Sequence, residues 1–373
     1  MAADSPGNFV SEWFGHRIYP AVVPSAEALA DQRQHRCPFL SRVKGVDQEC
    51  VKNVKSKGVC TISSCSNGPR QDWVACPYRV FDRRLIETVA GRLYSAEHVE
   101  AIAGPRLESA EARARILKSL KSRGRVLVYF DQKIGGEVSL PATEKSPEMA
   151  FDVTLVELLW RNDSLGLGRF GILEVQTMDF HGSYGRAVGN LTSGLELHRD
   201  AFPKVLEENQ WWAGDGIEGP NIANVFKRTF YQMMFKFNFG GHEACVGTAL
   251  MISASVWDSW QPFLAAPKLV EARDGTSRLL VPKARARDQR IPAWIYVFDL
   301  DPRPRSTPSP IRITKIIGVT ADALGHYALK LAPEQASRQL VSEAGVYATL
   351  RRRLQTHWPG QEIVVVGPES GEA

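Results

Sequence analysis

Two acidic residues and one glutamine have the chemistry and the spacing of a phosphodiester-cleaving site. Asp152 lies in the apolar run 149–160, and Glu174 and Gln176 lie in the apolar run 170–177. Both runs are typical of strands, and the polar, glycine-rich segment between them is typical of a turn. Two strands joined in this way are neighbours in a sheet, so Asp152 and Glu174 can reach one divalent cation.

The alternation along the second strand separates polar from apolar side chains. Residues i and i+2 of a strand point to the same face, so Glu174 and Gln176 share one face while Leu173 and Val175 share the other. Burying Leu173 and Val175 in the core therefore brings Glu174 and Gln176 together at the opposite surface.

Hydrolysis of a phosphodiester needs such a group of residues. A bound metal polarises the phosphoryl oxygen and activates the attacking water, and carboxylate oxygens suit Mg²⁺, which keeps several waters of its own. Gln176 cannot act as an ordinary general base, so we expect it to position the water or the phosphate. Taken alone the three residues are a weak signal, because solvated carboxylates at a sheet edge give the same pattern.

Five of the six cysteines fall within residues 37–76. A reducing cytoplasm keeps thiols unpaired, so this density favours metal ligands over disulfides. Cys37, Cys50, Cys60 and Cys76 are separated by twelve, nine and fifteen residues, unlike the tight pairs of a common zinc finger. Four thiolates in a tetrahedral array bind zinc or iron well, but the spacing alone leaves a metal site open.

The charge of the chain is concentrated in the same region. The net charge is +5 and the pI is near 8.8, which is compatible with a nucleic-acid partner. From Arg33 to Arg84 there are eleven Lys and Arg against four acids, so this segment is +7 and the rest of the chain is −2. A basic segment on a near-neutral body suits a partner that carries phosphates, although a solvated basic surface explains the charge equally well.

The flanking segments supply the elements that must position these residues. Helices are predicted over 82–93, 109–124, 224–239 and 333–356. Strands are predicted over 126–130, 149–160, 170–177, 293–300 and 311–319, with a turn and a strand start over 133–140. Residues 247–266 fit either type, and residues 302–310 form a proline-rich connector. The apolar residues of the first turns of the chain are expected to dock on the body: Phe9, Trp13, Phe14, Ile18 and Tyr19.

Helices mixed with strands predict an α/β (α+β mixed) core, a central mixed sheet flanked by helices. We expect four parts along the chain: a docking segment over 1–30, a loop-rich cysteine module over 31–84, a catalytic domain over 85–362 and a disordered tail over 363–373. There is no run of eighteen apolar residues and no secretory signal, so we expect a cytoplasmic protein with no membrane partner.

Long runs of this sequence resemble type II restriction endonucleases, over nearly the whole chain. The matching runs are FGHRIYP (14–20), CPFL (37–40), SPEMAFDVTL (146–155), GILEVQTMDFHGSY (171–184), EGPNIANVFKRTFYQM (218–233) and AWIYVFDLDP (293–302). Runs of this length are far more specific than a three-residue motif. The resemblance implies a PD-(D/E)xK restriction-endonuclease-like core in a homodimer. Its expected activity is Mg²⁺-dependent cleavage of both strands of double-stranded DNA at a GC-rich palindrome, leaving 5′-phosphate ends and 5′ overhangs.

Carried over residue by residue, the resemblance makes Asp152 and Glu174 the Mg²⁺ ligands. It puts Gln176 at the position where most nucleases of the superfamily have lysine, a departure that the resembling endonucleases share. Glu137, in GGEVS, matches an upstream acid near the metal, and its alternative is a solvated residue after a Gly-Gly turn. A cognate DNA methyltransferase is the implied partner in the same prokaryotic cytoplasm.

The resemblance also implies a structural iron held by four cysteines, with zinc as the other metal that thiolates accept. These cysteines are Cys37, Cys50, Cys60 and Cys76. Such a metal would fix the basic segment against DNA, and the alternative is that the module only supports the nuclease core. Cys65 has no counterpart, and Cys245 is expected to be a buried thiol.

The segment after the acidic motif also matches. Asp179, His181, Ser183 and Tyr184 are expected to contact the DNA backbone or to order the site, and no catalytic role is assigned to His181. Three arginines could read guanines or simply solvate a loop: Arg285, Arg287 and Arg290. The recognition sequence itself does not follow from these residues.

Two other functions are compatible with the pattern. A repair or structure-specific nuclease, such as a junction resolvase, would have the same acids but would usually be smaller and lack a metal module. A non-catalytic DNA-binding protein of the same fold would show a broken acidic cluster, whereas Asp152, Glu174 and Gln176 are all present.

Overall fold

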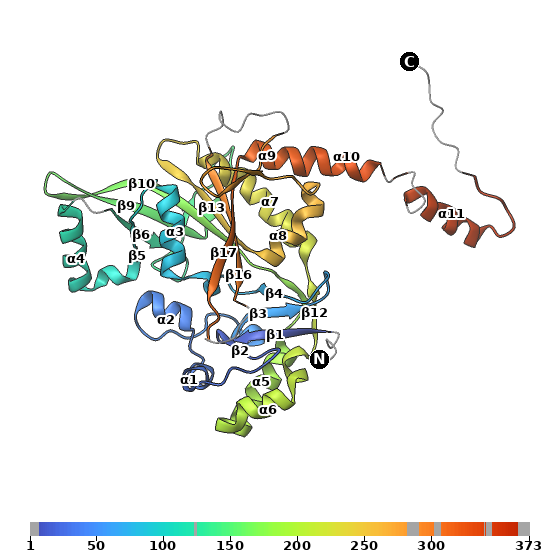
Figure 1. The fold of residues 1–373 in the computed structure, drawn as a ribbon, viewed down its shortest axis with the longest axis horizontal. Helices are drawn as coiled ribbons and strands as arrows, with labels where there is room; N and C mark the ends of the chain where they lie inside the picture. Colours follow the sequence, from blue (N-terminus) through green and yellow to red (C-terminus); the bar gives the residue numbers. More distant parts are fainter. Residues whose placement is uncertain are drawn as a thin grey trace, which may run out of the picture.

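A nine-stranded mixed sheet forms the centre of the computed structural model (Figure 1). The structure describes residues 7–122, 125–281, 291–301, 307–338, 340 and 345–364. In spatial order the strands are β14 (Val270–Glu271), β15 (Ser277–Arg278), β17 (Ile311–Val319), β16 (Ala293–Leu300), β13 (Cys245–Ser253), β10 (Ser164–Gln176), β9 (Val153–Arg161), β6 (Val126–Phe130) and β5 (Glu100–Ala103). The predicted mixed sheet is therefore confirmed, with β10, β13 and β16 parallel and β9 antiparallel to β10.

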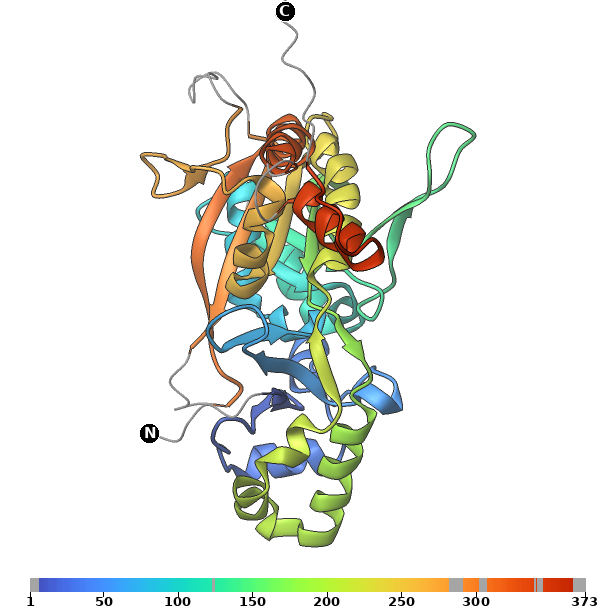
Figure 2. The same ribbon diagram turned by 90° about the vertical axis from the view of Figure 1, so that its right-hand side faces the viewer.

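Helices cover both faces of this sheet. Helix α3 (Arg83–Leu93) packs on the face that carries Leu173 and Val175, while α7 (Ile222–Phe239) and α8 (Ala254–Trp260) pack on the other (Figures 1 and 2). Helix α4 (Ala110–Lys121) lies under the β5–β6–β9 end. The caps follow the sequence, since the side chains of Asp82 and Ser109 accept backbone hydrogen bonds at the starts of α3 and α4.

The first strands of the chain belong to a separate four-stranded sheet with the cysteine-rich segment. Its spatial order is β2 (His16–Arg17), β1 (Asn8–Trp13), β3 (Val59–Ser64) and β4 (Gln71–Val74). Helices α1 (Ala26–Arg33) and α2 (Pro38–Lys44) connect these strands. All five apolar residues expected to dock are buried: Phe9, Trp13, Phe14, Ile18 and Tyr19. The region expected to be a docking segment thus shares one sheet with the cysteine-rich region.

The strand predicted over 149–160 is two strands that meet at Asp152. β8 (Met149–Phe151) pairs with β7 (Val138–Leu140), whereas β9 pairs with β6 and β10. At the break, the Asp152 amide donates to the side chain of Glu174 instead of to a neighbouring strand. The prediction of one continuous strand was wrong at this residue.

The turn before the second acidic strand is shorter than predicted. Only Asn162 and Asp163 form it, both with left-handed backbone (φ 51° and 56°), as a tight two-residue hairpin requires. Residues 164–169, which the glycine content assigned to the turn, instead extend β10 as a twisted ribbon paired with β9.

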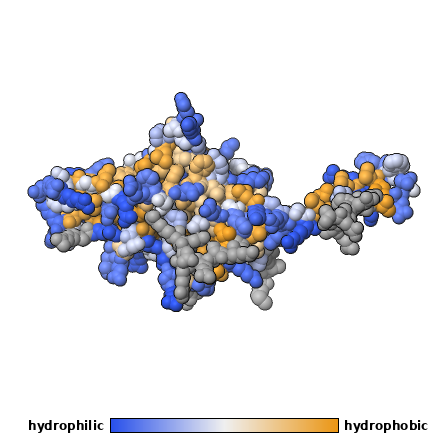
Figure 3. Space-filling view, turned by 90° about the horizontal axis from the view of Figure 1, so that it is seen from above, coloured by the Kyte–Doolittle hydropathy of each residue, from blue (hydrophilic) through white to orange (hydrophobic). Residues whose placement is uncertain are grey.

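The C-terminal helix predicted over 333–356 is not continuous. The structure has α9 (Ala321–His326), a π-helical segment over Tyr327–Leu331, α10 (Ala332–Ser337) and α11 (Val346–His357). Gly345 has an extended backbone and starts α11, which a glycine does more readily than it continues a helix. Helix α11 lies away from the sheet in Figure 1, and the surface view of Figure 3 shows apolar residues on it.

The remaining elements form a small helical lobe after the acidic motif. It contains β11 (Phe180–Gly182), α5 (Gly185–His198), α6 (Phe202–Glu208) and β12 (Ile217–Pro220), with β11 and β12 paired. The predicted helix over 224–239 is confirmed as α7, and residues 247–266 contain both β13 and α8. Within the described ranges, no helix combines the length and the apolar character needed to cross a membrane.

Candidate active site

The pairing of β9 with β10 brings Asp152 and Glu174 side by side. Leu173 on β10 lies opposite Val153, the first residue of β9. Glu174, which follows Leu173, is therefore adjacent to Asp152, which precedes Val153. The Val175 amide donates to Asp152 Oδ2 at 2.9 Å, and the Asp152 amide donates to Glu174 Oε1 at 3.3 Å. The two carboxylates are therefore held at one point by backbone hydrogen bonds.

Helix α7 covers the face of β10 that carries these side chains. Glu174 is 5% exposed, so the sequence-based expectation of an open surface was wrong. A small pocket remains between the strand and the helix, and Figure 1 shows α7 beside β13 and β10. Its lining residues are Asp152, Glu174, Val175, Gln176, Thr229, Gln232, Met233, Lys236, Phe237 and Leu250. Both acids and the glutamine predicted from the sequence thus meet in one pocket.

The pocket carries more negative than positive charge. Burial raises the pKa of Asp152, and burial followed by the charge of Asp152 raises the pKa of Glu174 to about 7. The ammonium of Lys236 acts in the opposite direction on both. Glu174 is buried whereas Asp152 is exposed, so one shielded and one solvent-accessible carboxylate face one cation, and such a site can accept a further cation.

Lys236 is the residue that the sequence analysis missed. Its ammonium donates to Glu174 Oε2, and the side chains of the two residues are 3% and 6% exposed. On α7, Lys236 falls on the face that carries Met233 and Phe237, which the structure buries. A lysine in the middle of a predicted apolar helix face was the available signal.

Gln176 is oriented by the same helix. The Thr229 hydroxyl contacts Gln176 Oε1, and the Gln176 amide nitrogen donates to the carbonyl of Thr177. Thr229 is buried on α7. The glutamine is therefore fixed at the edge of the pocket, as a residue that orients a ligand would be.

Two further acids lie near the pair. Glu137 is exposed, and the register that pairs Val138 with Phe151 makes Glu137 and Asp152 the next positions along β7 and β8. Asp131, which follows β6, accepts a hydrogen bond from the Tyr78 hydroxyl at 3.1 Å. Its pKa is raised by burial and, to a smaller extent, by the charge of Asp152. Glu137 is thus placed next to Asp152 by the register but does not line the pocket, and Asp131 is an acid that the sequence analysis did not select.

The residues after the motif lie on the surface beyond the pocket. His181 and Ser183 are exposed, and Asp179 pairs with Arg228 at 2.8 Å. Tyr184 is partly buried against the apolar core. None of the four has a hydrogen bond to Asp152 or Glu174 among the described residues. Arg285, Arg287 and Arg290 lie outside the described residues.

Four cysteines gather where the cysteine-rich segment meets the body. The interaction with the Cys60 thiol lowers the pKa of Cys76, and the charge of Lys52 acts in the same direction. The pKa of Cys60 is raised in turn. Burial raises the pKa of Cys37 to about 12, and the charges of Cys76 and Cys50 add to this. The set predicted from the resemblance is therefore one group of interacting thiols.

The other two cysteines lie apart from this group. Cys65 is partly exposed and accepts a hydrogen bond from Arg70 at 3.7 Å. Cys245 is buried, as predicted. In the part of the chain that the structure describes, no three His, Cys, Asp or Glu side chains are arranged to hold a metal ion. The four clustered thiols have the right donor chemistry for a thiophilic metal, and the Asp152–Glu174 pair has the oxygen donors that suit Mg²⁺.

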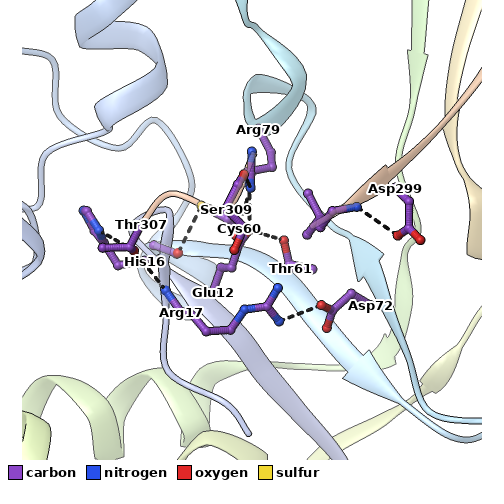
Figure 4. Close-up of polar contacts among 12 residues, drawn as sticks. Glu12, His16, Arg17, Cys60, Thr61, Asp72, Arg79, Asp299, Thr307 and Ser309 are labelled. Carbon is purple, nitrogen blue, oxygen red and sulfur yellow. Dashed lines mark hydrogen bonds and ion pairs between the residues drawn. The ribbon is translucent and has the colours of Figure 1, made fainter. Parts of the chain in front are cut away.

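A buried polar network joins the cysteine-rich region to the body (Figure 4). Arg79 donates to both oxygens of Glu12 at 2.7 and 2.9 Å and to the carbonyl of Ser309. Arg17 pairs with Asp72 at 2.6 Å. These arginines belong to the fold and are not available to a phosphate partner.

Other cations of the basic segment are also engaged internally. Arg36 pairs with Asp31 and Asp47, and Lys52 donates to the carbonyls of Val59 and Ala75 at 2.8 and 2.9 Å. The exposed cations of the segment are Arg33, Arg42, Lys55, Arg83 and Arg84, of which Arg33 pairs with Asp200 and Arg83 with Glu87. The +7 charge of residues 33–84 therefore overstates the cationic surface that this region offers.

Neither a scan against family models nor a search of curated proteins found a match to this chain.

Proposed function

We propose that this protein is a type II restriction endonuclease that cuts both strands of double-stranded DNA. The observation that supports this most is that Asp152 and Glu174 lie side by side on the central sheet. Together with Gln176 they line one pocket, which α7 covers. Sequence resemblance and the mixed sheet flanked by helices are both compatible with a PD-(D/E)xK core.

The chain's own residues account for the chemistry. Asp152 and Glu174 would hold Mg²⁺, which supplies charge stabilisation and an activated water when bound. Gln176, fixed by Thr229, would orient that water or the phosphate. Glu137, which the β7–β8 register places next to Asp152, would contribute a further oxygen to the site.

The expected substrate is a GC-rich palindrome, cut to give 5′-phosphate ends and 5′ overhangs. In a homodimer the two subunits are related by a two-fold axis, so each subunit's active site would meet one half of a palindrome. The exposed cations of the cysteine-rich region would contact the phosphates, together with the surface strand that carries His181. A cognate methyltransferase in the same prokaryotic cytoplasm would protect the host DNA.

Iron or zinc on Cys37, Cys50, Cys60 and Cys76 is the second metal of the proposal. Its function would be structural, because Cys37, Cys60 and Cys76 are buried in the same core as residues of α3, and Cys50 is partly buried. The proximity of the thiols supports such a metal, and a bound metal would hold them as thiolates.

Digestion of plasmid and genomic DNA with the purified protein tests the proposal. We expect discrete fragments with Mg²⁺ and intact DNA with EDTA, and sequencing of the fragment ends gives the site and the stagger. A smear, or cleavage only at junctions and other irregular structures, would favour a structure-specific or repair nuclease. Intact DNA under all conditions, with DNA still bound, would favour the non-catalytic DNA-binding protein.

A further inference from the structure

Helix α7 inserts one lysine into the acidic pocket. The ammonium of Lys236 donates to Glu174 Oε2 and lies 5.9 Å from the centre of the Phe151 ring. Among the described residues that line the pocket, Lys236 is the only cation. Burying an ammonium is costly, and a long apolar side chain would fill the same space without that cost.

The lysine does not complete a balanced ion pair. Glu174 is paired, whereas the exposed Asp152 beside it has, among the described residues, a backbone amide and no side chain as a hydrogen-bond donor. One ammonium therefore serves two carboxylates, and the pocket keeps an excess negative charge. This imbalance distinguishes Lys236 from a lysine that only stabilises the fold.

Lys236 and Gln176 line the same pocket from opposite sides. Thr229, which contacts Gln176, is seven residues before Lys236 on α7, so both lie on the same side of the helix two turns apart. Gln176 occupies the motif position at which a lysine would bring a positive charge to the phosphate. In this chain the positive charge reaches the pocket from the helix.

We propose that Lys236 is the counter-ion of this site, neutralising Glu174 until a divalent cation binds and then supplying to the phosphate the positive charge that Gln176 lacks. This inference rests on the proposed nuclease function. Because Glu174 Oε2 cannot serve the ammonium and a metal ion equally, the two cations compete for it.

Calcium binding tests the competition without DNA or catalysis. In calorimetric titrations at one fixed pH, K236M should bind Ca²⁺ about tenfold more tightly than the wild type. The matched control is K227M, because Lys227 is an exposed lysine of the same helix and should leave the affinity unchanged. Unchanged or weaker Ca²⁺ binding by folded K236M would overturn the proposal. If K236M does not fold, K236Q is measured in its place, with the same expected result.

Cleavage tests the second half of the proposal. K236M should cut roughly 100-fold more slowly although it binds metal more tightly, a split that a purely structural role would not give. Moving the lysine to the motif position, in the double variant Q176K/K236M, should recover about tenfold of the lost rate. Wild-type cutting by K236M, or a relocated lysine that restores nothing, would contradict the inference. A wild-type protein that binds Ca²⁺ but cuts no DNA would instead refute the nuclease function.

Discussion

Glu12 and Glu174 are both buried glutamates, and their surroundings give them opposite properties. Glu12 accepts two hydrogen bonds from Arg79 and one from the Thr61 hydroxyl at 2.6 Å, and its pKa lies below the ordinary value despite complete burial. Glu174 has Asp152 beside it and one ammonium opposite, and its pKa is raised to about 7. The negative charge of Glu12 is matched by the guanidinium of Arg79, whereas Glu174 and Asp152 share the single ammonium of Lys236.

The difference shows what burial of a charge implies. A buried ion pair with satisfied hydrogen bonds fixes the positions of the segments that carry it, here β1 and the turn after Cys76 (Figure 4). Glu174 is a buried carboxylate next to a second, exposed carboxylate and has only one cation, so it has no such balance, and a perturbed group of this kind in a pocket is a candidate functional group. Each prediction below tests this contrast.

The largest effect is expected at the cysteines, a third set of buried ionisable groups. Purified protein should contain about one tightly bound iron or zinc per chain, and Ser at Cys37, Cys50, Cys60 or Cys76 should remove it and destabilise the region. Elemental analysis and thermal unfolding measure both effects. Cys65→Ser is the matched control and should keep the metal. Retention of metal by Cys60→Ser together with loss by Cys65→Ser would show that the ligand assignment is wrong.

Truncation of the two glutamates should separate stability from activity. Glu12→Ala leaves the guanidinium of Arg79 buried without its partner and should cost about 3–5 kcal/mol of unfolding free energy. Glu174→Ala relieves the repulsion with Asp152 but leaves Lys236 unpaired, so its cost should be smaller. Urea unfolding of both variants measures the two losses of unfolding free energy. Equal losses would remove the distinction between the two sites.

The stabilities of the two sites should depend on pH in opposite directions when divalent cations are absent. Glu174 holds its proton more tightly in the folded state, so its contribution is present below its ordinary pKa of 4.5 and is lost as the pH rises towards about 7. Glu12 has a lowered pKa when folded, so its contribution is present above 4.5 and is lost as the pH falls through the folded value. For each glutamate, the urea midpoint of the Gln variant is subtracted from that of the wild type at each pH. Plotted against pH, this difference should fall for Glu174→Gln and rise for Glu12→Gln. Slopes of the same sign would contradict the charge balance described for the two pockets.

A smaller effect is expected at Gln176. Gln176→Ala should slow cleavage roughly 10- to 100-fold without weakening DNA binding, because a positioned group is lost and no metal ligand is. Thr229→Val removes only the hydroxyl that holds the glutamine and should give a smaller loss. Single-turnover rates and gel shifts measure these effects, and a fully active Gln176→Ala variant would rule out the positioning role.

Much of the frame of the site followed from local sequence patterns. Alternation along 170–177 correctly placed Glu174 opposite Leu173 and Val175, and the apolar spacing over 224–239 correctly predicted α7. The break at Asp152 did not follow, because the hydrogen bond that the Asp152 amide makes there goes to a side chain twenty-two residues away. Periodicity describes neighbours within an element, and it carries no information on such a contact.

The same limit explains the residues that were missed. Nothing in the sequence says that α7 lies over β10, so the burial of Glu174 and its pairing with Lys236 could not be derived. Net charge overstated the cationic surface of residues 33–84, because it does not distinguish Arg79, buried against Glu12, from exposed Arg84. Tertiary pairing decides both cases.

The most direct test of the central claim is cleavage by Glu174→Ala and Asp152→Ala under single-turnover conditions with Mg²⁺. The account predicts that each variant folds and binds the DNA that the wild type cuts, while the cleavage rate falls roughly 1,000-fold or more, because the oxygen ligands of the metal are lost. Glu196→Ala removes an exposed acid of α5 and should cut at the wild-type rate. Cleavage by folded Glu174→Ala at a rate close to that of the wild type would show that this pocket is not the active site.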